Sequence, residues 1–168
     1  MKSIIKYSPL YIIGLLVSIV IYPIMHEFGH LITALLANVR IVDINIFPLS
    51  YISCDMENAT DLSVVAVGMG GMLMPFFISC VVKTNFFWLW YANIIIQFIS
   101  LFSFVMSGVS ALLFVFDIKV ANDDVAQILN LLPNHQWIII ALLLLLTILI
   151  IVKIIRSKFA IRLLEYYL

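Results

Sequence analysis

The sequence predicts an α-helical integral membrane protein with about four transmembrane helices. It also predicts a short membrane-associated β-hairpin after the first of them and a short helix before the last. Hydrophobic residues make up 65% of the 168 residues and charged residues only 11%, whereas a soluble domain is about half apolar and about a quarter charged. Four long apolar runs support the same fold class. The net charge of zero offers no basic surface for nucleic acid, so we expect no nucleic-acid partner.

The predicted spans belong to a single domain, 1–168, and cover residues 9–37, 62–82, 86–107 and 136–155. The first begins like a signal peptide, but no small-x-small cleavage site follows, so we interpret it as an uncleaved span. It is longer than a hydrocarbon core of roughly 30 Å requires. Pro23 can kink it, because the proline ring displaces the hydrogen bond to the Ile19 carbonyl. The glycines of "GMGG" in the second span permit close approach of a neighbouring helix.

Two connections between spans carry their own patterns. Residues 39–53 alternate, with Asp43 and Asn45 on one side and apolar residues on the other, which predicts a surface β-hairpin. Before the last span, Asp123 or Asp124 can cap a short helix that Pro133 ends. The tail, residues 156–168, has the basic amphipathic pattern of a helix that lies along lipid headgroups.

The segment "HEFGH" places three ionisable residues, His26, Glu27 and His30, inside the first apolar span. On a helix, residues four apart share one face, so the two imidazoles can bind one Zn²⁺. The glutamate can then act as general base toward a water molecule at the metal. A charged group at the bilayer centre costs about 2.5–3.5 kcal/mol, and intramembrane ionisable residues are therefore usually functional. A chance pattern of buried polar residues explains the three side chains less economically.

A catalytic zinc needs a third protein ligand. Local pattern alone leaves the choice open among a few acidic or imidazole side chains: Asp123, Asp124, His135, Glu57 and Asp117.

The stretch "HEFGHLITALLANVRIVDINIFPL" resembles the first motif region of the site-2 protease family of intramembrane zinc metalloproteases. In that family the HExxH helix leads into a membrane-associated β-hairpin, and a later aspartate that opens a helix is the third ligand. Laid on "DVAQIL", the family pattern assigns that ligand to Asp124. Val125 and Ala126 replace its two glycines, and "GGMLMP", with Pro75 in place of asparagine, is similar to a further family segment.

The resemblance implies a minimal core without a regulatory domain. It would hydrolyse a peptide bond within or beside the transmembrane segment of a membrane protein or peptide. His26, His30 and Asp124 would hold Zn²⁺, and Glu27 would be the catalytic base. The hairpin would hold an unwound substrate stretch as an added strand, for which we name Asn45, Ile46 and Phe47.

Polar side chains of the third span share one face, and Asn93 is the first of them, before Gln97 and Ser100. Asn93 either holds a substrate carbonyl or hydrogen-bonds across the bundle. Two other functions remain open. One is a metal-binding membrane transporter or sensor. The other is a non-catalytic relative that acts as an immunity or chaperone-like factor.

We expect the protein in a bacterial cell membrane. The positive-inside rule places both termini in the cytoplasm, because the basic residues gather in three regions that four spans bring to one side: Lys2 and Lys6, Lys83, and Lys153, Arg156, Lys158 and Arg162. The hairpin then lies on the opposite side.

Overall fold

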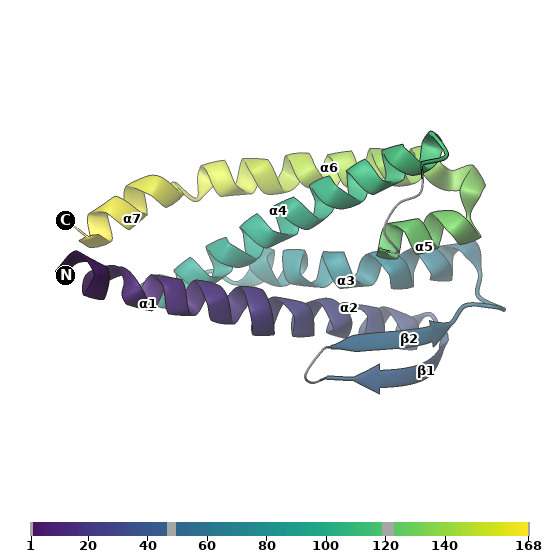
Figure 1. Cartoon of the computed structure of the whole chain (residues 1–168), viewed down its shortest axis with the longest axis horizontal. Coiled ribbons are helices and arrows are strands. Elements are labelled where there is room, and N and C mark those ends of the chain that lie inside the picture. Colours follow the sequence, from purple (N-terminus) through teal and green to yellow (C-terminus); the bar gives the residue numbers. More distant parts are fainter. Residues whose placement is uncertain (1, 47–49, 119–122, 168) are drawn as a thin grey trace.

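The computed structural model describes residues 2–46, 50–118 and 123–167 of the chain. The described part is mostly helical, and four of its helices are long and apolar enough to cross a membrane: Ser8–Leu36, Asp61–Val81, Phe87–Val115 and Pro133–Tyr166. The first and last helices, α1 and α7, lie at one end of the bundle, and the hairpin and α5 lie at the other (Figure 1). The structure thus confirms the predicted number of apolar helices, the hairpin and the short helix before the last span.

The first long helix is continuous but changes type in its middle. It consists of α1 (Lys2–Leu16), a π-helical turn (Val17–Ile21) and α2 (Tyr22–Leu36). In the π-helical turn the Tyr22 N–H donates to the Val17 carbonyl. Pro23, which follows at once, has no N–H and its ring crowds the carbonyl four residues back. A widened turn accommodates that ring, because it moves the hydrogen bonds from i−4 to i−5.

The hairpin consists of the antiparallel strands β1 (Arg40–Asn45) and β2 (Tyr51–Asp55). The register shifts between Ile41 and Asp43, so a β-bulge interrupts the alternation that the sequence predicts. The Tyr51 hydroxyl donates to the Asp43 carboxylate across the strands at 2.6 Å. That hydrogen bond raises the pKa of Tyr51. In Figure 1, β2 lies on the helix side of the hairpin and β1 on the outer side.

Helix α3 (Asp61–Val81) crosses α2 at very close range, and glycines make this possible. A Cβ on Gly29 would collide with the Gly70 carbonyl group and lie 2.8 Å from the Met74 Cβ. The predicted close approach at "GMGG" is therefore present, with Gly29 of "HEFGH" as its partner.

Helix α4 (Phe87–Val115) extends past the end predicted at 107. Ser107 and Ser110 are polar residues at and just beyond the predicted end. Both side chains face the interior, where the Ser107 hydroxyl donates to the Met72 sulfur at 3.2 Å. Inward-facing serines are compatible with a helix that continues.

The remaining elements complete the bundle: α5 (Asp124–Leu131), a 3₁₀ turn (Pro133–His135), α6 (Gln136–Arg156) and α7 (Phe159–Tyr167). The tail helix packs on the aromatic start of α4. The Arg162 guanidinium lies 4.6 Å from the centre of the Trp90 ring, and the Phe159 ring stacks on the same tryptophan.

The main core joins α3, α4, α5 and α6 through fully buried side chains such as Met69, Phe104, Leu129 and Leu143. The outer faces of the long helices are apolar and exposed, as at Ile19, Phe102 and Leu144. Soluble monomers rarely expose apolar patches beyond a few hundred Å², so these faces suggest a membrane-associated protein.

Candidate metal centre

The two histidines of "HEFGH" lie one turn apart on α2 and converge on one point. Their Nε2 atoms are 3.2 Å apart. His30 is buried, and its Nδ1 lies 2.7 Å from the Val67 carbonyl oxygen of α3. Because a carbonyl can only accept, Nδ1 carries a hydrogen and donates it. This bond orients the ring and directs Nε2 toward His26, as the outer hydrogen bond of a metal-binding histidine does.

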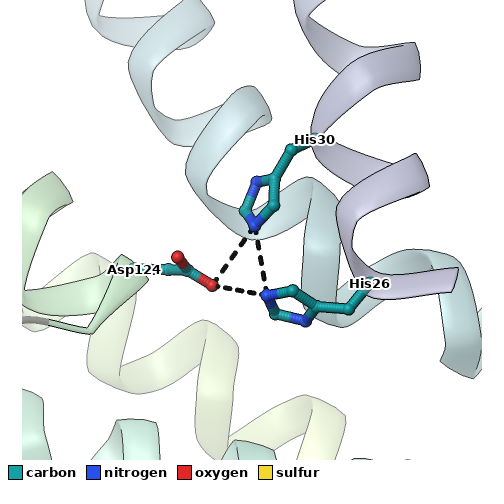
Figure 2. Close-up of side chains that lie close together, drawn as sticks. All are labelled: His26, His30 and Asp124. Atoms are coloured by element: carbon teal, nitrogen blue, oxygen red, sulfur yellow. Dashed lines mark hydrogen bonds and ion pairs between the residues drawn. The ribbon is translucent and has the colours of Figure 1, made fainter. Parts of the chain in front are cut away.

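Asp124 completes the group from a distant part of the chain. It opens α5, and its Oδ2 lies 3.0 Å from His26 Nε2 and 3.4 Å from His30 Nε2. Figure 2 shows the three side chains pointing toward one another from α2 and α5. The neighbouring Asp123 caps α5, because its Oδ1 accepts a hydrogen bond from the Ala126 N–H at 2.7 Å. Asp123 therefore stabilises the helix that positions Asp124.

The geometry and chemistry of this group fit a metal ion. A tetrahedral Zn²⁺ with bonds of about 2.0–2.1 Å keeps its ligand atoms about 3.3–3.4 Å apart. The three distances, 3.0, 3.2 and 3.4 Å, are close to that edge length. Two imidazole nitrogens and one carboxylate oxygen are ligands that zinc accepts. Within the described part of the chain, this is the one group of three such side chains near enough to share an ion.

The charge state of Asp124 suits a ligand as well. Burial raises the pKa of the Asp124 carboxyl, but hydrogen bonds with the imidazoles of His26 and His30 outweigh burial and hold that pKa well below its ordinary value. The carboxylate is therefore ionised at neutral pH, as metal binding requires.

Gly71 of α3 lies directly against both histidines. A Cβ at Gly71 would lie 2.8 Å from Cε1 and Nε2 of His26, and it would be closer still to Nε2 of His30. The imidazoles thus occupy the space that a side chain at position 71 would fill. The absence of a side chain there is a condition for the histidine pair to have this geometry.

A cavity of about 320 Å³ opens beside the metal group. Its polar wall includes Glu27, His30 and Asp124, and the four residues 51–54 of β2 form another wall. The Glu27 side chain lies next to the Ile52 backbone. Glu27, which the sequence predicts as the general base, therefore lines the same cavity as His30 and Asp124 of the metal group.

The other predicted site residues lie elsewhere. Asn45 pairs with Tyr51 at the end of the hairpin, Ile46 is exposed beyond β1, and Phe47 lies outside the described residues. Asn93 does not line the cavity. Its amide donates to the carbonyls of Ser79 and Val82 at the far end of α3, which corresponds to the helix-bridging alternative. Of the remaining ligand candidates, Glu57, Asp117 and His135 are not part of the group.

Sequence reasoning missed three features of the site. The Val67 carbonyl is a backbone acceptor, so no residue type marks it. Gly71 was visible only as part of a glycine-rich segment, without a sign that it faces the histidines. The role of β2 as the cavity wall depends on which strand faces the helices, and alternation within a strand carries no such information.

No family model matches the chain, and comparisons with curated proteins and with solved structures found no match.

Proposed function

We propose that this protein is an intramembrane zinc metalloprotease, similar to the site-2 proteases, that hydrolyses a peptide bond in or next to a transmembrane segment of its substrate. The observation that carries the proposal is the grouping of His26, His30 and Asp124 at a cavity that Glu27 also lines. Metal binding alone has no need of Glu27, whereas hydrolysis needs a base at this place.

His26, His30 and Asp124 would hold the Zn²⁺. The ion, when bound, supplies Lewis acidity, which makes water a stronger acid and polarises a carbonyl group. Glu27 takes a proton from the attacking water and returns one to the leaving amine. The hydrogen bond from His30 to the Val67 carbonyl keeps the imidazole in the tautomer that leaves Nε2 free.

The cavity wall formed by β2 supports an unwound substrate. Residues 51–54 of β2 line the cavity, and the edge of a strand can offer backbone hydrogen bonds to an extended stretch of substrate. The exposed apolar faces of the long helices support a place within the bilayer for both partners.

The test compares the wild type with Glu27→Gln, expressed in the same host. Glu57→Gln is the matched control, because Glu57 is exposed and the change removes the same charge. Membrane proteomes are searched for fragments cut within a span, and zinc content is measured on the purified proteins. We expect Glu27→Gln to abolish the fragments and to retain roughly stoichiometric zinc, and Glu57→Gln to resemble the wild type.

Fragments that persist in Glu27→Gln, or zinc that is lost from this folded variant, would contradict the proposal. A transporter, sensor or scaffold would retain its function in Glu27→Gln, which separates those alternatives from a protease.

A further inference from the structure

The cavity beside the metal group has two chemically different ends. Along α5, residues 124, 127, 128 and 131 line it, a spacing of one helix face. Asp124 and Gln127 are the polar part of this face, and the apolar Ile128 and Leu131 follow. From Asp124 to Leu131 the helix rises about 10 Å.

The far part of the cavity is lined by apolar side chains from three segments. Met56 follows β2, Val64 belongs to α3, and Ile128 and Leu131 belong to α5. Val64 and Ile128 are 5% and 1% exposed, so they form a fixed floor. Gly68 makes room for this floor, because a Cβ there would lie 2.6 Å from the Ile128 Cδ1.

Glu27 and Asp124 are the charged side chains of the cavity lining. Asp124 is part of the metal group, and Glu27 lies near the same three side chains. A charged substrate group at the apolar end would meet no opposite charge. A bulky apolar group would gain contacts there.

We propose that the apolar end, formed by Met56, Val64, Ile128 and Leu131, is a substrate subsite that binds one bulky apolar side chain. An extended chain advances about 3.3 Å per residue, so about three residues span the 10 Å between Asp124 and Leu131. The bound side chain therefore stands within about three positions of the cleaved bond. This inference rests on the proposed function and names the substrate preference of the same site.

The subsite can be tested without turnover, because Cys54 also lines the cavity. The full-length Glu27→Gln protein is used in a Cys80→Ser background, so that Cys54 is the single thiol. Burial raises the pKa of the Cys54 thiol, and alkylation is therefore followed at mildly alkaline pH. The probes are a short alanine–serine peptide with one central leucine and the same peptide with a central aspartate.

We expect the leucine peptide to slow Cys54 alkylation at least about tenfold more than the aspartate peptide, on the scale of discrimination by apolar pockets. Leu131→Lys should reverse this preference. Leu131 is 52% exposed, so the protein tolerates the change, and Leu131→Met should retain the leucine preference. Asn130→Lys is the matched control, because it adds the same charge to α5 outside the cavity lining.

Equal protection by both peptides, protection by neither, or a leucine preference that persists in Leu131→Lys would overturn the subsite. The two proposals can fail separately. If the peptides show the preference while the wild type cuts no substrate, the protease proposal is wrong and the binding site stands. If the wild type cleaves its substrate but the peptides show no preference at this site, the subsite proposal is wrong and the protease proposal stands.

Discussion

Gly71 lies outside the "HEFGH" motif, yet the structure predicts that Gly71→Ala disrupts metal binding. The added Cβ would lie 2.8 Å from His26 Nε2, and an ordinary contact begins at 3.4 Å. The imidazole must therefore move by at least about 0.6 Å, which is larger than the tolerance of about 0.2 Å for a metal–ligand distance. His30 Nε2, which would be closer still to that Cβ, must move as well.

We expect Gly71→Ala to lose at least about 10–100-fold in zinc affinity, the scale seen when a supporting partner of a ligand is removed. The helix should persist, since alanine favours a helix by up to about 1 kcal/mol over glycine and the displaced atoms are side-chain ends. Zinc affinity is measured by competition with a chelator, and the fold by circular dichroism of the detergent-solubilised protein.

Gly108→Ala is the control for Gly71→Ala. Nothing lies within 4 Å of a Cβ at Gly108 in α4, so this variant should bind zinc as the wild type does. If Gly71→Ala also binds zinc with wild-type affinity, the histidines are not held against α3 as described, and the reasoning is refuted.

Asp124→Asn should keep its helix content and lose tight zinc binding. Asp123→Asn should lose at most about 10–100-fold in zinc affinity, because asparagine still caps a helix. Zinc loss in Asp123→Asn alone would contradict this assignment. Gly29→Ala should lower the free energy of unfolding by about 1–3 kcal/mol or more. The reason is that the new Cβ would collide with the α3 backbone, which cannot move as a flexible side chain could. Unchanged thermal unfolding would argue against the close crossing of α2 and α3. Single cysteines at Ser50 and Lys158, labelled with an impermeant maleimide in intact cells, should react from outside only at Ser50; external labelling at Lys158 would reverse the orientation.

Features that depend on local pattern could be predicted from the sequence. Apolar runs longer than a bilayer predict the long helices, because helix and hydropathy are properties of contiguous residues. The spacing of His26 and His30 places both imidazoles on one face of α2 for the same reason. Alternation predicted the hairpin but not the bulge at Ile41 and Asp43.

Contacts between distant segments follow from the fold and could not be predicted from local pattern. Asp123 and Asp124 are adjacent carboxylates at one helix start, and local pattern does not separate them; the resemblance to a known family chose Asp124. In the structure, Ile128 of α5 packs against Gly68, and Asp124, one turn earlier on the same face, points toward the histidines, while Asp123 caps the helix. The bond from His30 to the Val67 carbonyl and the packing of the imidazoles against Gly71 likewise arise from the crossing of α2 and α3. The cavity wall of β2 depends on which strand faces the helices. Each feature depends on which backbone lies opposite and not on the residue type alone.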